Sequence, residues 1–303
     1  MGKQMLLIRN PRAGSLLAQN TFMKAAKIVF RSEYDVYLYS TRYSGDAARL
    51  VAETGGAYDR IVCFGGDGTL NEVINGLMHL DKRPELGYIP AGTTNDFAAG
   101  LGLSGSIPRA ARDAINGEPF LMDVGLFGDS RYFTYVASFG VFTSASYNAP
   151  QEVKNAIGYS AYLLEGIKSL AEIHPYRVRV RSDNIDLEDE FIFGGVSNST
   201  SMGGILKLDR SAVDLSDGLF EVLLVKKPKS LQDLQKTLHG LISRDYDSET
   251  VLFFKTADIT MSCEDSFAWT SDGEFAGVTK QVRMRNCHNA VTMIRPRRGE
   301  KRC

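Results

Sequence analysis

Apolar runs of strand length alternate with segments of helical periodicity in the first 125 residues. The runs predicted as strands are 5–11, 34–41, 60–66 and 85–90, and the segments predicted as helices are 16–32, 44–54 and 69–80. Strands joined by single helices favour a parallel sheet, and ligands of such sheets bind at the carboxyl ends of the strands. This part of the chain is therefore predicted to be an α/β domain.

The pattern changes from about Asp123 onward, where strand-like runs outnumber the two helical stretches, 156–173 and 231–243. The runs with strand character are 123–142, 176–182, 190–198, 219–227, 258–263, 267–274 and 281–287. Antiparallel pairing is expected to dominate among them. The prediction is an N-terminal parallel-sheet α/β domain, 1–127, and a C-terminal antiparallel, sandwich-like β domain, 128–290, with residues from about 291 to 303 packing back on the first.

Composition narrows the functional classes. The 303 residues carry a formal net charge of -1, which gives no global attraction to nucleic acid. The four cysteines lack CxxC spacing and a nearby histidine, so we expect free thiols in a reducing compartment. No run approaches the ~18 apolar residues of a membrane span. The basic tail "RPRRGEKRC" could attract an anionic lipid surface, although a solvated terminus is the favoured interpretation.

The stretch "CFGGDGTLNE", 63–72, places three glycines between a buried strand and a helix predicted to open at Thr69. Glycine permits positive φ and a close approach of the backbone to a ligand, and unpaired N–H groups at a helix start favour phosphate. A structural alternative is a tight turn in which Thr69 and Glu72 form a capping box. The residues match neither a P-loop nor a GxGxxG motif.

Asp67 changes the chemistry expected of this loop. An uncompensated carboxylate would repel phosphate, whereas a divalent cation could bridge the carboxylate to phosphate oxygens. The loop therefore points to a complex of a nucleotide with magnesium.

The ordered motifs of the whole chain resemble the bacterial diacylglycerol kinase and related lipid kinase family. "GGDGTLNEVINGL" and "IPAGTTNDFA" carry the resemblance together with "NPRAG", "MDVG", "AVDLSDGLFEV" and "TSDGEFAG". The GGDGT loop is shared with sphingosine and ceramide kinases and, more distantly, with NAD kinases. The ordered set is more specific than the loop alone.

The resemblance implies ATP as co-substrate and Mg²⁺ as cofactor. It extends the nucleotide contacts over successive strand ends, with Gly92 beside them. The implied contacts are Asn10, Pro11, Arg12, Ala13, Gly14, Thr41, Gly65, Gly66, Asp67, Gly68, Thr69, Leu70, Asn71, Glu72 and Thr93. Taken singly, the Asn-Pro and Gly-Thr pairs are also common turn residues.

Phosphoryl transfer to an alcohol needs a base for the hydroxyl proton. By resemblance that base is Glu274, with Asp67 and Asp123 holding catalytic magnesium or orienting the base. Without the resemblance, Asp272-Gly273 reads as a type I′ hairpin turn. The resemblance also implies a second, structural magnesium site at Asp214, Asp217 and the carbonyl of Leu219, where the alternative is a plain polar loop with Gly218 at a turn.

Several positions depart from the family pattern. Ser15, Ala99 and Glu165 stand where basic residues are common, and Ser211 replaces a usual proline. The missing cations leave the substrate open. None of the four histidines has a recognisable catalytic partner in the sequence.

The function predicted is an ATP- and Mg²⁺-dependent lipid kinase that converts diacylglycerol to phosphatidic acid at a membrane surface. A sphingoid lipid, a glycolipid or NAD remains an alternative substrate, and a non-catalytic nucleotide-binding module remains an alternative class. The expected location is cytoplasmic with peripheral membrane association, and a homodimer stays open.

Overall fold

A computed structural model of the protein divides into two units, Met1–Val124 with His288–Cys303, and Gly125–Cys287. The structure describes residues 2–11, 18–92, 95–141, 175–202, 206–208, 213–243, 246 and 249–297. The predicted helix 156–173 lies outside these residues. The domain boundaries predicted from the sequence, 1–127 and 128–290, stay a prediction.

Parallel strands form the sheet of the first unit in the order β4-β3-β1-β2. They are β1 (Gln4–Arg9), β2 (Asp35–Ser40), β3 (Arg60–Gly65) and β4 (Glu85–Pro90). The last part of β15 (Glu274–Arg295) pairs in parallel with β4, Met293 opposite Leu86. Every residue of β3 is buried, as expected for a parallel strand covered on both faces.

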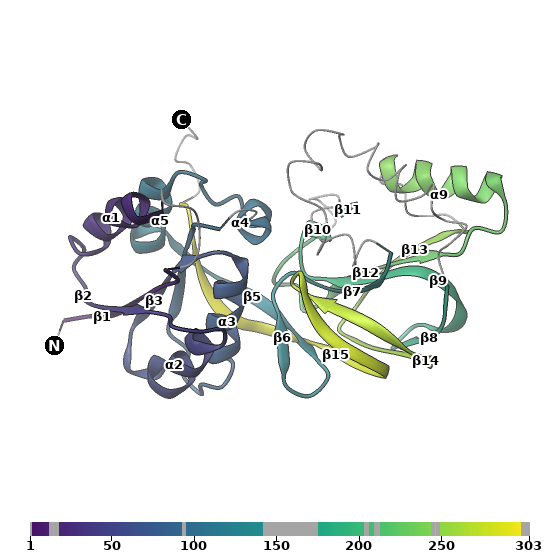
Figure 1. The fold of residues 1–303 in the computed structure, drawn as a ribbon, viewed down its shortest axis with the longest axis horizontal. Coiled ribbons are helices and arrows are strands. Elements are labelled where there is room, and N and C mark those ends of the chain that lie inside the picture. The colour runs from purple at the N-terminus through teal and green to yellow at the C-terminus, as the bar shows by residue number, and fades with distance from the viewer. Residues whose placement is uncertain are drawn as a thin grey trace. The chain divides into compact units, whose positions relative to one another are not determined.

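Helices cover both faces of this sheet. Helices α1 (Ala18–Val29) and α5 (Ile107–Asn116) lie on one face, and α2 (Asp46–Thr54) and α3 (Asp67–Leu77) lie on the other (Figure 1). The short elements α4 (Asp96–Leu101) and η1 (Gly55–Ala57) complete the unit. Small alanines of α5 and aromatic residues of α1 and β3 meet in one buried cluster, which includes Phe22, Phe64, Ala110, Ala111 and Ala114.

The second unit is built from antiparallel strands. Its elements are β5 (Glu118–Phe127), which begins in the first unit, β6 (Arg131–Phe133), β7 (Val136–Gly140), β8 (Tyr176–Ser182), β9 (Asp186–Ser197), β10 (Ser201–Met202), β11 (Leu206–Lys207), β12 (Phe220–Lys226), α9 (Leu231–Ser243), β13 (Val251–Thr256), β14 (Asp258–Ser271) and the first part of β15. Strand pairs β12–β13, β12–β9, β7–β9, β8–β9, β14–β7, β14–β8 and β14–β15 are all antiparallel.

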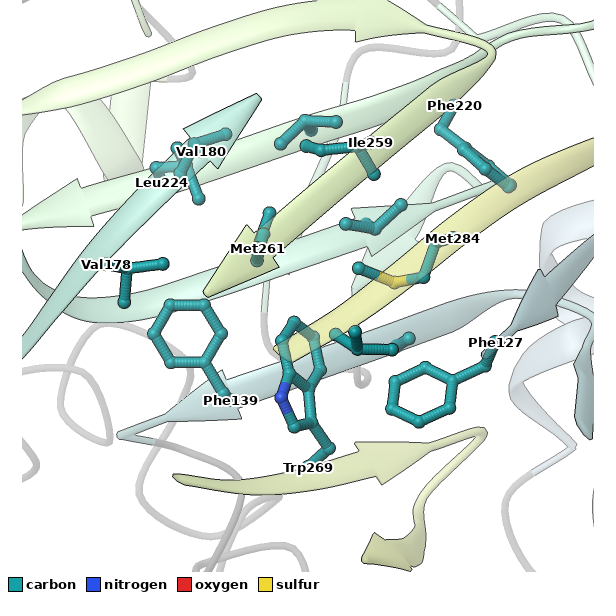
Figure 2. Close-up of a cluster of buried hydrophobic side chains, with 14 of the residues drawn as sticks. Phe127, Phe139, Val178, Val180, Phe220, Leu224, Ile259, Met261, Trp269 and Met284 are labelled. Carbon is teal, nitrogen blue, oxygen red and sulfur yellow. The ribbon is translucent and has the colours of Figure 1, made fainter. Parts of the chain in front are cut away.

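Two long strands, β9 and β14, hold the second unit together because each pairs with β8 at one end and with β7 at the other. A register shift lies between Ser262 and Phe267 of β14. The side chains that these strands enclose form an apolar core, with Trp269, Phe139 and Met261 among its members (Figure 2). Trp269 and Phe139 meet edge to face with ring centroids 5.1 Å apart.

The predicted fold class is confirmed, and so is helix 231–243 at both ends. The elements that were not predicted are α4, α5, η1, β10, β11 and β13. The separate runs 258–263 and 267–274 are parts of one bulged hairpin, because β14 continues across the register shift. Cys63 and Cys263 are free thiols, as expected.

Candidate functional site

The carboxyl ends of the parallel strands form one continuous edge in the first unit. Main-chain hydrogen bonds link neighbouring ends, from Thr41 N–H to Arg9 C=O (2.9 Å), from Asn10 N–H to Phe64 C=O (3.2 Å) and from Ala91 N–H to Gly65 C=O (2.8 Å). The Asn10 amide also donates to Thr69 Oγ1 at 3.0 Å. The residues predicted from separate motifs, Asn10, Thr41 and the 65–69 loop, are thus brought together at the edge where ligands of such sheets bind.

The glycines of this edge serve close packing. A Cβ on Gly92 would lie 2.6 Å from Gly66 Cα, and a Cβ on Gly65 would lie 2.8 Å from the Thr69 side chain. None of Gly65, Gly66, Gly68 and Gly92 has a positive φ. The loop therefore does not use the positive φ that glycine permits, and the close approach seen here is between two backbone segments.

Helix α3 begins at Asp67, two residues before the predicted start at Thr69. Gly66 precedes it in an extended conformation, φ -88° and ψ -178°, and the Leu70 N–H bonds to the Gly66 carbonyl at 3.1 Å. The Leu70 side chain is buried, so only its main chain could meet a nucleotide. The unpaired N–H groups at this helix start offer partial positive charge.

Asp67 is held by polar contacts at the start of α3. Its Oδ2 accepts the Asp96 N–H at 2.8 Å and its Oδ1 accepts the Tyr88 hydroxyl at 3.3 Å. Burial raises the pKa of Asp67 to about 6; the Asp96 and Tyr88 hydrogen bonds lower it, and the negative charge of Asp96 raises it further. A carboxylate whose ionised form is disfavoured in this way would gain from a cation beside it.

Glu72 does not form the capping box with Thr69. Its Oε1 accepts the Gly45 N–H at 2.8 Å and its Oε2 accepts the Ala47 N–H at 3.2 Å. Glu72 therefore satisfies donors at the start of α2, a different helix. The bonds tie the turn after β2 to α3, next to the predicted nucleotide contact Thr41.

Asp123 is fully buried and bonded to β15 within the same unit. Its Oδ1 accepts the Asn289 N–H at 2.7 Å and lies 3.1 Å from His288 Nδ1. His288 thus has a carboxylate partner that could not be recognised in the sequence. Asn289 precedes Met293, the partner of Leu86, by four residues, so this contact lies toward the amino end of β4. Asp67, in contrast, follows the carboxyl end of β3. The predicted catalytic role of Asp123 stays a prediction.

Glu274 is the first residue of β15 and lies exposed beside a two-residue turn. Asp272 (φ 50°) and Gly273 (φ 80°) both have positive φ, which a type I′ turn requires, and this reading is confirmed. The buried Asp272 carboxylate accepts from Thr134 N–H (2.7 Å), Thr134 Oγ1 (2.8 Å), Tyr135 N–H (3.0 Å) and Val136 N–H (3.1 Å). These bonds fasten the turn, and with it Glu274, to the segment between β6 and β7.

The predicted metal loop precedes β12 in the second unit. Asp214 Oδ1 accepts from the Ser216 N–H (3.1 Å) and hydroxyl (2.9 Å), while Asp217 Oδ1 accepts from the Leu219 N–H (3.0 Å). Asp217 Oδ2 pairs with Lys255 Nζ at 2.9 Å. Two carboxylates and a carbonyl suit Mg²⁺ chemically, but one oxygen already has a cation beside it. In the described part of the chain no group of three or more His, Cys, Asp or Glu residues is arranged to hold a metal.

Other predicted positions lie outside the described residues, namely Arg12, Ala13, Gly14 and Thr93, together with Ser15, Glu165 and Ser211. Pro11 and Asn71 are described, at the end of β1 and within α3. The assignment of all these residues to nucleotide or metal stays a prediction.

Comparison with known proteins decides the family. The model "Diacylglycerol kinase catalytic domain" matches residues 4–127, and "YegS C-terminal NAD kinase beta sandwich-like domain" matches residues 136–295. The diacylglycerol kinase of Bacillus subtilis (strain 168) is 31% identical over 278 residues, which cover 91% of each chain. The chain belongs to the diacylglycerol kinase family. It is accordingly an enzyme, a lipid kinase, and the resemblance noted in the sequence is confirmed.

Other members of the diacylglycerol kinase family show the same extent of similarity. The diacylglycerol kinase of Staphylococcus epidermidis (strain ATCC 12228 / FDA PCI 1200) is 33% identical over 282 residues, 91% of this chain and 87% of the relative. A Bacillus anthracis str. Sterne protein, described provisionally as a diacylglycerol kinase, has a solved structure that superposes with a TM-score of 0.79. Its identity is 26%, and the superposition covers 97% of both chains.

The described helices of this kinase include none that is long and apolar enough to cross a membrane.

Sequence reasoning missed the surroundings of Asp67 in this lipid kinase. Tyr88 comes from the middle of β4, and Asp96 begins α4, 29 residues after Asp67. The one available signal was Asp96 itself, which belongs to the quoted "TTND" stretch. Tyr88 gave none, since a tyrosine within a buried strand is ordinary core.

The contact between the glycine loops of the kinase predicts a packing defect in Gly92→Ala. The added Cβ would meet the Gly66 backbone, so we expect a loss of about 1–3 kcal/mol in unfolding free energy. The variant should also bind a non-hydrolysable ATP analogue more weakly, because the added Cβ forces the loops that contain Gly66 and Gly92 apart. Urea unfolding and calorimetric titration measure both effects. Gly56→Ala, whose Cβ would have no neighbour within 4 Å, is the matched control and should behave as wild type.

Proposed function

We propose that this lipid kinase transfers the γ-phosphate of ATP to the hydroxyl of diacylglycerol, with Mg²⁺, and releases phosphatidic acid. The observation that carries the proposal is the continuous edge formed by Asn10, Thr41, Gly92 and the 65–69 loop at the carboxyl ends of parallel strands. The names of the relatives supply the substrate class.

In this proposal the strand-end edge binds the nucleotide. The N–H groups at the start of α3 face the phosphates, and Asn10 and Thr69, already joined by a hydrogen bond, orient that loop. Glu72 stabilises the arrangement indirectly, since it holds the turn that follows Thr41. A cation beside Asp67 would stabilise the ionised form of this carboxyl, which burial disfavours.

Glu274 acts as the base that accepts the proton of the lipid hydroxyl. Its carboxylate is exposed, as a group that must meet an incoming substrate has to be. Asp272 holds the hairpin turn through its bonds to residues 134–136, so that the base stands on a rigid element. As the hydroxyl oxygen forms its bond to the γ-phosphorus, the bond from the γ-phosphorus to the bridging oxygen of ADP breaks.

Magnesium fits the donors that the chain offers at two places. Asp67, with the charge of Asp96 beside it, would hold the ion of the nucleotide, and Asp214, Asp217 and the Leu219 carbonyl would hold a second ion in the loop before β12. When bound to the nucleotide, Mg²⁺ supplies charge neutralisation at the phosphate oxygens.

Because diacylglycerol resides in a bilayer, this kinase is proposed to work at a membrane surface as a peripheral protein. A homodimer, which the sequence left open, is part of the same proposal and is tested by sedimentation equilibrium of the purified full chain. A single species with the mass of one chain would remove the dimer from it.

The function is tested with γ-labelled ATP and a panel of acceptors: diacylglycerol in mixed micelles, a sphingoid base, a glycolipid and NAD. Labelled phosphatidic acid is the expected product, with Mg²⁺ and not with EDTA. Transfer to NAD in preference to lipids, or to no acceptor at all, would overturn the proposal.

Asp67→Asn should abolish this transfer, because it removes the charge that faces the cation. Asp81→Asn, an exposed aspartate before β4 with no role in the site, is the matched control and should keep the wild-type rate.

A further inference from the structure

Lys255 lies between two carboxylates next to the proposed metal loop. Its Nζ is 2.9 Å from Asp217 Oδ2 and 3.2 Å from Glu221 Oε1. Glu221 on β12 and Lys255 on β13 are directly paired residues of adjacent strands, so the distance is set by the sheet. The side chain of Glu221 is fully buried, whereas those of Lys255 and Asp217 are 30% and 24% exposed.

Glu221 keeps Lys255 at this position. Among the described residues, neither carboxylate oxygen of Glu221 makes a hydrogen bond of normal geometry, and the Lys255 ammonium group is the charge beside it. A buried carboxylate without a counter-charge is strongly unfavourable. The lysine therefore cannot move far from Glu221 without leaving that carboxylate uncompensated.

A fixed ammonium group beside Asp217 matters for the loop. Asp217 has its Oδ1 engaged by the Leu219 N–H, and Lys255 occupies Oδ2, the oxygen that a metal would need. A divalent cation at this loop must either displace Lys255 from Asp217 or bind against its positive charge.

We propose that Lys255 is a built-in counter-ion that competes with a divalent cation for Asp217, and that Glu221 is the positioning residue that holds Lys255 there. The inference rests on the proposed metal loop of the lipid kinase. It assigns a role to Glu221, a buried and otherwise unsatisfied glutamate on β12. In this proposal the ion pair between Lys255 and Asp217 determines how tightly the loop binds a metal.

The test is titration of the full-length protein with Mn²⁺ and with Mg²⁺ alone, without nucleotide, by calorimetry. Lys255→Met frees Asp217 and should bind the ion about tenfold more tightly, since a hydrogen bond to a charged group is worth roughly that ratio. Glu221→Gln removes the charge that holds Lys255 at this position, so it should also tighten binding, by less than Lys255→Met does. Asp217→Asn, combined with each of these variants and introduced alone, identifies which part of the measured heat comes from metal binding at the loop.

Two controls separate competition from a general effect of charge. Lys226→Met removes the same charge from β12, where Lys226 pairs with Asp189 at 2.8 Å with a side chain equally exposed, and it should leave metal affinity unchanged. Salt at 0.5 M screens long-range electrostatic attraction but does not remove Lys255 from Asp217 Oδ2. The difference in metal affinity between Lys255→Met and wild type should therefore persist at this salt concentration.

Lys255→Met could fail to fold because it leaves Glu221 unpaired, and the double variant Lys255→Met/Glu221→Gln then serves in its place. If wild type and the Lys255 variants bound the metal with equal affinity, the proposed competition would be wrong, although the proposed metal site in the loop would remain. Absence of binding in both would overturn it as well and remove the loop metal, whereas the lipid phosphorylation assay judges the kinase reaction independently.

Discussion

Glu274→Gln is expected to lower the turnover of diacylglycerol by about 10²–10⁴-fold, the range that a positioned base contributes to proton transfer. Glutamine has the shape of glutamate but cannot accept the proton of the hydroxyl. Since Glu274 is exposed, the variant should unfold at the wild-type temperature and bind ATP as wild type does. Initial rates with labelled ATP at saturating lipid measure kcat, and the effect should fall on kcat with little change in the KM for ATP.

Glu264→Gln on the neighbouring strand β14 is the matched control, because Glu264 is also an exposed glutamate but lies away from the turn. It should keep the wild-type rate. A Glu274→Gln enzyme with nearly full kcat would mean that another group takes the proton, and the assignment of Glu274 would have to be given up.

Asp272→Ala is expected to have the largest effect on stability, about 3–5 kcal/mol of the unfolding free energy, because several buried donors lose their acceptor and each costs about 1–3 kcal/mol when left unsatisfied. The substitution leaves the N–H groups of Thr134, Tyr135 and Val136 and the Thr134 hydroxyl without the carboxylate they bond to. Urea denaturation followed by tryptophan fluorescence measures it, since the single tryptophan, Trp269, lies on the same hairpin strand. Activity should fall too, because the turn that carries Glu274 is released.

Asp265→Ala, an exposed aspartate of β14, is the control and should lie within about 0.5 kcal/mol of wild type. Asp272→Asn keeps one acceptor oxygen and should be intermediate. If Asp272→Ala were as stable as wild type, the bonds to residues 134–136 would not hold the turn, and the proposed support of Glu274 would fail.

Local patterns were enough for most regular elements of this kinase. Strand β4 was predicted at both ends, since its apolar residues form an uninterrupted run between turn residues. Helix α9 was predicted equally well, because its apolar residues keep one face. The turn at Asp272-Gly273 was recognisable because few residue pairs adopt positive φ twice in succession.

Elements without a strong pattern were missed. Helix α5 buries alanines, Ala110, Ala111 and Ala114, and a face of small residues gives a weak apolar signal. The bulge in β14 breaks the alternation of its side chains, which is why this one strand was predicted as two separate runs, 258–263 and 267–274. The helix start at Asp67 was placed two residues late because glycine is a poor helix former, yet Gly68 lies within the first turn.

The sequence alone determined the alternation of elements, the glycine loop with its aspartate, the turn beside Glu274 and the family of the chain, because each depends on residues close together or on an ordered set of motifs. Only the tertiary structure decided which partner each carboxylate has. Glu72 reaches another helix, Asp123 meets His288 165 positions away, and Lys255 stands between Asp217 and Glu221. Such pairs arise where distant strands and helices pack, and the free energy of a buried charge depends on those neighbours rather than on sequence spacing.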